Sequence, residues 1–121
     1  MDPNDLKIRT KKFAHRCIKL AANLPKTSLG RHIQNQIVRC STSVAANYRA
    51  TCLSQSKKAF IAKISIVIEE IDETTFWLEF IIEEDIFSLQ KINPLLNEAK
   101  ELTSIFIASR ITAEKSIVNI Q

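Results

Sequence analysis

Glycine is nearly absent from this chain of 121 residues, with Gly30 as its one example, and proline occurs only three times. Sheet proteins of this size place both residues in hairpin turns, so the shortage argues against an all-β or a doubly wound α/β fold. Glycine-rich phosphate loops and dinucleotide fingerprints need two or three glycines and are excluded as well. A few long helices joined by short loops fit this composition.

Groupings of residues that carry metal, redox or catalytic chemistry are also missing. The three cysteines form no C-x-x-C pair and lie among apolar neighbours, where a reduced cysteine packs as a small hydrophobe. The acids of residues 69–84 would suit a di-iron bundle only with Glu-x-x-His pairs, and neither His15 nor His32 follows a carboxylate at that spacing. No grouping of serine, histidine and acid suggests nucleophilic catalysis. We expect no metal, no cofactor and no enzymatic activity.

Signals for export or membrane insertion are absent too. The chain opens with Met-Asp-Pro-Asn-Asp, without the basic and apolar regions of a signal peptide. Charges interrupt the longest apolar runs, as Glu79 does within residues 76–82, so no membrane span is expected. Apolar residues make up 45% and charged residues 25%, a balance typical of folded proteins. We expect a single domain over residues 1–121, located in the cytoplasm.

Apolar residues recur at helical spacing in four segments, and no segment alternates as a strand would. The first three helices are predicted over residues 3–23, with Asp2 as N-cap, over about 27–52, and over about 56–84. Gly30 falls in the first turns of the second helix, where a missing side chain would let a loop or helix approach closely.

Residues 85–92 are predicted to be a connector with at most a single helical turn. Asn93 and Pro94 then match an N-cap and first helical position, which predicts a fourth helix that ends near Ile117. Four helices with short connections predict an all-α, up-down-up-down four-helix bundle. The side chains expected in its core are Leu6, Phe13, Cys17, Leu20, Leu24, Ile33, Ile37, Cys40, Val44, Tyr48, Phe60, Ile64, Val67, Ile71, Leu78, Ile82, Leu95, Ala99, Leu102 and Phe106.

The third predicted helix has more apolar surface than one buried stripe needs. At about 100° per residue, Ile66, Trp77 and Phe80 project away from the main stripe, among several glutamates. A helix that is apolar on two sides must bury both, and one chain supplies only one core. We expect Ile66, Trp77 and Phe80 to form the interface of an oligomer.

The net charge of +4 conceals a strong asymmetry along the chain. Residues 1–63 hold 13 of the 17 Lys and Arg with only two acids, whereas residues 64–121 hold the other 11 acids. Such asymmetry indicates either a polyanion partner for the basic half or pairing of one half with the other, within or between chains. Both interpretations remain open.

Two basic helix faces are candidate binding surfaces. Arg9, Lys12, Arg16 and Lys19 step by three and four residues along the first helix, and acids that would pair with them are missing from it. The alternative is a solvated face that covers the edge of the core.

The second helix presents Arg31, Asn35, Thr42 and Arg49 on the side away from its core stripe, with Arg39 close by. Small residues Thr42, Ala45 and Ala46 leave this surface low, so it could admit a neighbouring helix or a nucleic-acid backbone. Alternatively, its arginines pair with acids of the third helix across a subunit contact. Neither basic face carries interleaved exposed aromatics, so nucleic acid would be bound through phosphates, with steep salt dependence and little sequence preference.

Residues 39–50, RCSTSVAANYRA, resemble the R-x-x-x-S-[VI]-x-x-N-[IY] signature of the four-helix-bundle family of 23S ribosomal-RNA intervening-sequence proteins. Residues 56–61 and 70–79 are similar to the segments that follow this signature, and residues 98–102 to the start of the family's last helix. The resemblance spans nearly the whole chain. Arg49-Ala50 stands where many members carry Glu-Gly, a departure that adds positive charge and indicates a variant branch.

The resemblance implies a bundle that assembles as a ring-like homopentamer, without established enzymatic activity. Arg39, Ser43 and Asn47 are its motif positions, with an implied structural role. Some members are encoded within bacterial ribosomal-RNA genes. A related branch serves diversity-generating retroelements as an accessory protein that binds reverse transcriptase and RNA.

We therefore predict a non-enzymatic, self-associating protein that binds RNA or another nucleic acid through basic helix faces. The residues predicted to contact phosphates are Arg9, Lys12, Arg16, Lys19, Arg39 and Arg49. The alternative is a structural adaptor whose oligomer binds a protein partner, with the basic residues used in inter-subunit salt bridges.

Overall fold

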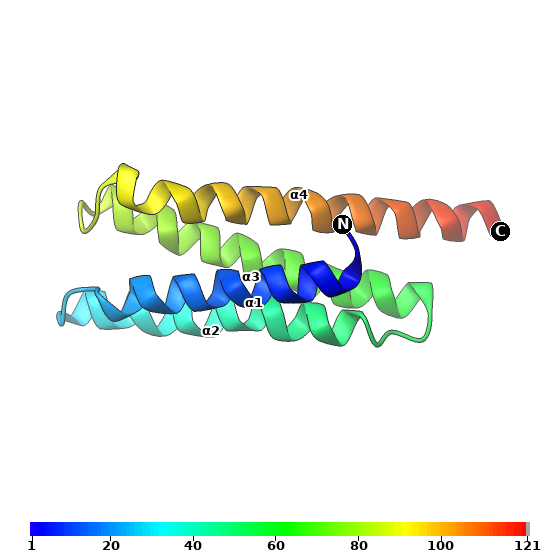
Figure 1. The fold of residues 1–121 in the computed structure, drawn as a ribbon, viewed down its shortest axis with the longest axis horizontal. Coiled ribbons are helices and arrows are strands. Elements are labelled where there is room, and N and C mark those ends of the chain that lie inside the picture. The colour runs from blue at the N-terminus through cyan, green and yellow to red at the C-terminus, as the bar shows by residue number, and fades with distance from the viewer. Residues whose placement is uncertain (121) are drawn as a thin grey trace.

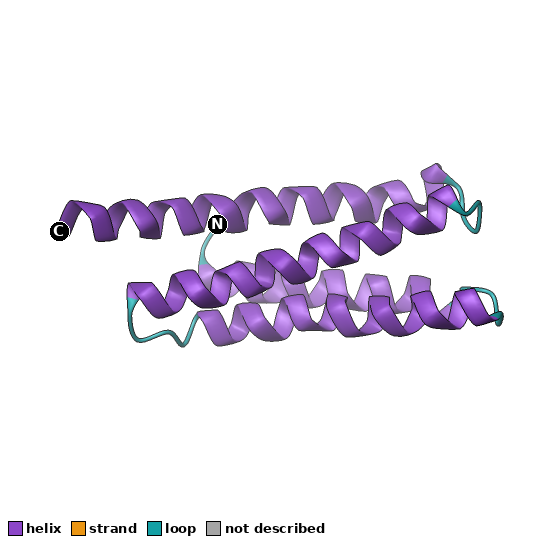
Figure 2. Ribbon diagram, turned by 180° about the vertical axis from the view of Figure 1, so that it is seen from behind, coloured by secondary structure: helices purple, strands orange, loops and turns teal. Residues whose placement is uncertain are grey.

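Four helices joined by short loops make up the chain in a computed structural model, which describes residues 1–120 and the side chains of residues 1–118 (Figures 1 and 2). They are α1 (Pro3–Ala22), α2 (Ser28–Thr51), α3 (Lys57–Glu83) and α4 (Leu89–Ile120). Consecutive helices run antiparallel, and the described residues contain no strand. The predicted all-α class and up-down-up-down order are confirmed.

The first three helices begin where the sequence predicts, because each has an N-cap side chain. Each cap oxygen accepts a hydrogen bond from the backbone N–H three residues later, which satisfies a donor that the first helical turn leaves free. The bonds are Asp5 N–H to Asp2 at 2.9 Å, Gly30 N–H to Thr27 at 3.0 Å and Ala59 N–H to Ser56 at 3.0 Å.

The predicted start of the fourth helix at Pro94, with Asn93 as its N-cap, is wrong. Helix α4 begins at Leu89, so the helical turn allowed in the 85–92 connector is the first turn of α4, and Pro94 lies inside the helix. The Ser88 hydroxyl accepts a hydrogen bond of 3.2 Å from the N–H three residues later, as an N-cap does. Within the added turn, the side chain of Ile92 is fully buried. Burial of Ile92 and the Ser88 cap therefore offset the backbone bond that Pro94 cannot make.

Helix α3 ends in a turn that usually contains glycine, with Asp85 in its place. The Ile86 N–H donates to the Ile81 carbonyl and the Asp85 N–H to the Ile82 carbonyl, both at 3.0 Å, the pattern of a Schellman motif. Asp85 has a φ of 55°, in the left-handed region that aspartate tolerates better than most residues.

The single glycine allows a close backbone contact between the α1–α2 loop and the first turn of α2. A Cβ on Gly30 would lie 1.9 Å from the carbonyl oxygen of Pro25. No side chain fits at that distance, so the expected close approach at Gly30 is confirmed and its partner is the loop.

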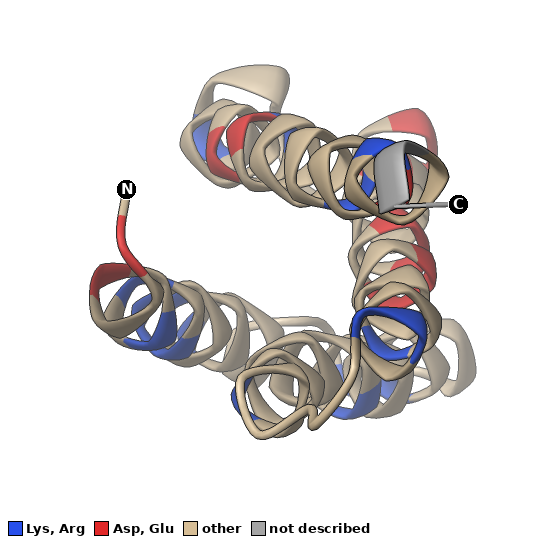
Figure 3. Ribbon diagram, turned by 90° about the vertical axis from the view of Figure 1, so that its right-hand side faces the viewer, with Lys and Arg blue, Asp and Glu red and all other residues tan. Residues whose placement is uncertain are grey.

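The core runs along the bundle between helices that follow one another in sequence. Helix α1 packs on α2, α2 on α3 and α3 on α4, whereas α1 and α4 share a much smaller contact. An end-on view shows α1 and α4 apart at this end of the bundle (Figure 3). The predicted core side chains are buried except Phe60 and Ile82, which are partly exposed. On the last turns of α3, Ile81 is fully buried instead.

Candidate nucleic-acid interface

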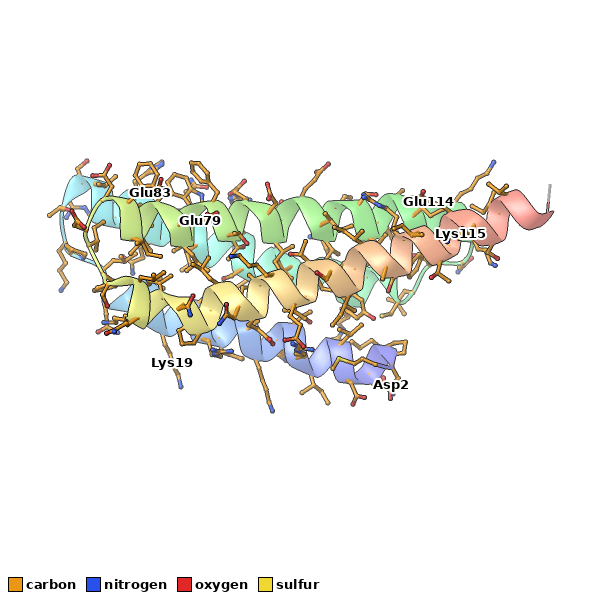
Figure 4. The ribbon with its side chains drawn as sticks, turned by 90° about the horizontal axis from the view of Figure 1, so that it is seen from above. Asp2, Lys19, Glu79, Glu83, Glu114 and Lys115 are labelled. Carbon is orange, nitrogen blue, oxygen red and sulfur yellow. The ribbon has the colours of Figure 1, made fainter. Side chains whose placement is uncertain are left out.

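Helix α1 carries an exposed basic face made of Lys12, Arg16 and Lys19. Among the described side chains, none of the three forms an ion pair. Figure 4 shows Lys19 projecting away from the bundle, with Glu79 and Glu83 on the other side of the molecule. Helix α1 contains one acid and α2 none, so the positive charge of each helix is not neutralised by acids of the same helix.

Arg9 lies on the same side of α1 but is held by α4. Its Nε and Nη2 donate to the two carboxylate oxygens of Glu98 at 2.8 and 2.6 Å, and Nη2 lies 2.9 Å from Glu101. The hydrogen bond from Arg9 lowers the pKa of Glu98, against the opposing effect of burial. The Arg9 side chain is only 19% exposed. Arg9 therefore joins α1 to α4 and has little capacity left for a phosphate.

Arg39 is engaged on a different side of the molecule, between α2 and α3. Its guanidinium pairs with Glu70 at 3.2 Å and with Glu73, and also donates to Gln36. These acids belong to the same chain as Arg39. The structure thus separates Arg39 from the basic face of α1.

The other two motif positions, Ser43 and Asn47, are linked to each other along α2. The Asn47 amide donates to the Ser43 carbonyl at 2.9 Å and to its hydroxyl at 2.8 Å. Both side chains are partly buried. These contacts lie within one helix and give the pair a local structural role.

Arg49 lies in a third place, a groove of about 560 Å³ between α1 and α2. Small side chains and isoleucines form the floor of this α1–α2 groove, and basic side chains form its rim. The lining residues are Lys7, Ile8, Lys11, Ala14, His15, Ile18, Thr42, Ala45, Ala46 and Arg49. Of the six predicted phosphate contacts, Arg9, Lys12, Arg16 and Lys19 share one face, while Arg39 and Arg49 lie elsewhere.

The three predicted interface residues lie on α3, but they differ in exposure. Ile66 is 43% exposed, whereas Trp77 and Phe80 are half-buried and pack against the core. Sequence reasoning missed Phe76, which is 51% exposed and contacts Trp77 edge-on, with ring centroids 4.9 Å apart. It also missed His32 of α2, whose ring contacts the Trp77 ring edge-on, with ring centroids 5.4 Å apart. Phe76 and Phe80 are four residues apart and therefore neighbours on one helix face, and this spacing could have identified Phe76 from the sequence.

Other chemistry finds little support among the described residues. They contain no group of three or more side chains that could hold a metal ion. Cys17 and Cys40 are buried, and burial raises the pKa of the Cys17 thiol to about 12, which makes it a poor nucleophile. No described helix is long and apolar enough to cross a bilayer.

Comparisons with known proteins agree with the resemblance seen in the sequence. A solved structure of a protein of unknown function from the S23 ribosomal protein family of Bacteroides thetaiotaomicron superimposes with a TM-score of 0.83 and 29% identity, covering 91% of this chain and 98% of that one. No curated protein matches significantly. The model of the 23S rRNA-intervening sequence protein family matches residues 4–108. The chain therefore belongs to the family of 23S rRNA-intervening sequence proteins.

Proposed function

We propose that this protein is a non-enzymatic, self-associating bundle that binds RNA in the cytoplasm through the basic face of α1. One observation carries the proposal: Lys12, Arg16 and Lys19 are exposed on one face and none is paired with a described acid. Side chains arranged in this way suit a row of phosphates and give no reading of base sequence. Arg9 borders this face, and its carboxylate partners limit its contribution.

Self-association is the second part of the proposal, with the ring-like homopentamer implied by the family as the expected form. It is supported by apolar side chains on the side of α3 away from the core, where Ile66 and Phe76 are exposed. Replacing both with serine is expected to give a lower mass in light scattering without loss of helicity. This pair is a better test than Trp77 and Phe80, because those two rings also stabilise the core.

RNA binding is tested by a salt titration with fluorescently labelled RNA and DNA. The triple variant Lys12→Glu, Arg16→Glu, Lys19→Glu is expected to bind much more weakly, and to lose about 0.7 to 0.9 of the salt slope for each phosphate contact removed. A matched control reverses Lys58, Lys100 and Lys115, which are exposed on α3 and α4 and change the net charge equally. Equal loss in both variants would show that net charge alone attracts the RNA.

A structural adaptor is the second candidate, favoured by the exposed ring of Phe76 and by the pairing of Arg9 and Arg39 with carboxylates of their own chain, which leaves both with little capacity for phosphate. In that case the oligomer binds a protein, and basic residues without a partner in the chain form the inter-subunit salt bridges. The same titration separates the two functions. An intact oligomer that binds neither RNA nor DNA at low salt would favour the adaptor.

A further inference from the structure

The α1–α2 groove is a concave surface that the chain itself leaves uncovered. Ile8 on its floor is 57% exposed, and Ala46 is also exposed. Lys11 and Arg49 line the groove and form no ion pair among the described residues. An apolar floor with an unneutralised basic rim suits an apolar helix with acidic flanks.

Helix α3 presents such a surface on the side away from its core stripe. Apolar and acidic residues follow one another there at spacings of three and four, the repeat that keeps side chains on one face of a helix. We call this face the α3 outer stripe; it consists of Ile66, Glu69, Glu73, Phe76, Phe80 and Glu83. Glu69 and Glu83 are exposed and form no ion pair among the described side chains.

The stripe is also long enough to fill the groove. The groove extends over residues 7–18 of α1, about 17 Å at the rise of an α-helix, and the stripe from Ile66 to Glu83 covers about 26 Å. The stripe faces away from the core of its own bundle and the groove is uncovered in its own chain, so the two surfaces can meet only between copies. We propose that the α1–α2 groove of one copy receives the α3 outer stripe of a second copy.

A second copy fits the groove better than RNA does. The floor offers Ile8, Ile18 and alanines, which gain nothing from a charged phosphate backbone but bury well against Ile66 and Phe76. Lys12, Arg16 and Lys19 do not line the groove, so the proposed RNA face stays free. Each copy contributes its α3 outer stripe to one neighbour and its α1–α2 groove to another, so the contact is head-to-tail. Such contacts close into a ring or continue as a filament.

This inference rests on the self-association in the proposed function, and a charge exchange tests it. The groove variant Lys11→Glu, Arg49→Glu and the stripe variant Glu69→Lys, Glu83→Lys each place like charges across the contact. Each variant alone is expected to lose more than about tenfold in self-affinity, measured by light scattering over a concentration series. Combined in one chain, the four substitutions restore opposite charges at every contact of a ring with any number of copies, so assembly is expected to return. The rescue also shows that the four substitutions leave the chain folded.

A steric variant gives an independent measurement. Ala46→Trp fills the groove without changing charge, and Ala22→Trp places the same side chain on an exposed position outside the groove. Loss of assembly in the first variant only supports the proposal. An oligomeric wild type with unchanged assembly in both the charge variants and Ala46→Trp overturns this interface and leaves self-association standing. A wild type that is monomeric at every concentration overturns both.

Discussion

Arg9 and Glu98, which are 89 residues apart in sequence, form a two-pronged ion pair that joins α1 to α4. Their side chains are 19% and 16% exposed, so the contact is largely shielded from solvent. Among the helix pairs that pack against each other, α1 and α4 share the smallest contact. Arg9 contributes to the stability of the fold, whereas its neighbour Lys12 on the same face is exposed and unpaired among the described residues.

Replacing Arg9 with alanine is expected to lower the free energy of unfolding by about 1.5 to 3 kcal/mol, because the hydrogen bonds to a charged partner are lost and Glu98 is left without its cation. Lys12→Ala, the matched control, is expected to change it by less than about 0.5 kcal/mol. Urea denaturation followed by circular dichroism measures both. Equal effects would contradict the assignment of Arg9 to stability.

The same ion pair predicts a dependence of stability on pH. Since the hydrogen bond from Arg9 lowers the pKa of Glu98 in the folded state below its ordinary value of 4.5, the unfolded chain takes up the proton first as pH falls. The stabilisation is therefore complete above about pH 5 and is lost as pH falls through the folded-state pKa. Urea melts between about pH 6 and 3 should show a shallower decline for Glu98→Gln than for wild type. Parallel curves would assign acid sensitivity to other carboxylates.

Gly30→Ala is expected to destabilise the protein even though alanine is the better helix former. The added Cβ meets the Pro25 carbonyl oxygen at 1.9 Å, and a backbone atom cannot move aside as a flexible side chain can. Overpacking of this kind costs about 1 to 3 kcal/mol, which exceeds the gain in helix propensity of about 1 kcal/mol. Ala46→Gly, on the exposed face of the same helix, serves as the control for propensity alone. A higher melting temperature for Gly30→Ala would contradict the close contact.

Asp85→Gly is expected to stabilise the chain by about 0.5 to 1 kcal/mol, since glycine adopts the left-handed conformation without strain. Removal of a negative charge from the C-terminal end of α3 acts in the same direction. Asp85→Asn isolates the effect of charge, because it keeps a side chain of similar shape. Thermal unfolding of the three proteins should rank glycine and asparagine above aspartate.

Local signals in the sequence predict most of the fold, because caps and core stripes act within a few residues of one another. Asp2, Thr27 and Ser56 place three helix starts to within one residue. The start of the fourth helix was predicted wrongly, because the preference of Pro94 for a first helical position is local. Burial of Ile92 in the core outweighs that preference and extends the helix back to Leu89. The spacing of apolar residues within one segment cannot show how much stability is gained by packing against another helix.

The basic face of α1 follows from helical spacing alone, but the partners of its residues do not. Arg9 and Lys12 lie on the same face of a helical wheel, and the approach of α4 distinguishes them by placing Glu98 beside Arg9. Arg39 and Arg49 share α2, yet one faces the acids of α3 and the other lies in the α1–α2 groove. Assigning a charge to binding or to stability thus requires the packing between helices.

The order in which the helices pack also has a consequence for how quickly the chain folds. Every major packing contact joins helices that are neighbours in sequence, so the chain closes only short loops to form its core. Helical bundles with such local contacts fold in microseconds to milliseconds. The seam between the first and last helices, where Arg9 meets Glu98, requires the longest loop closure and should form last. Stopped-flow measurements should therefore show that Arg9→Ala mainly accelerates unfolding and leaves the folding rate nearly unchanged.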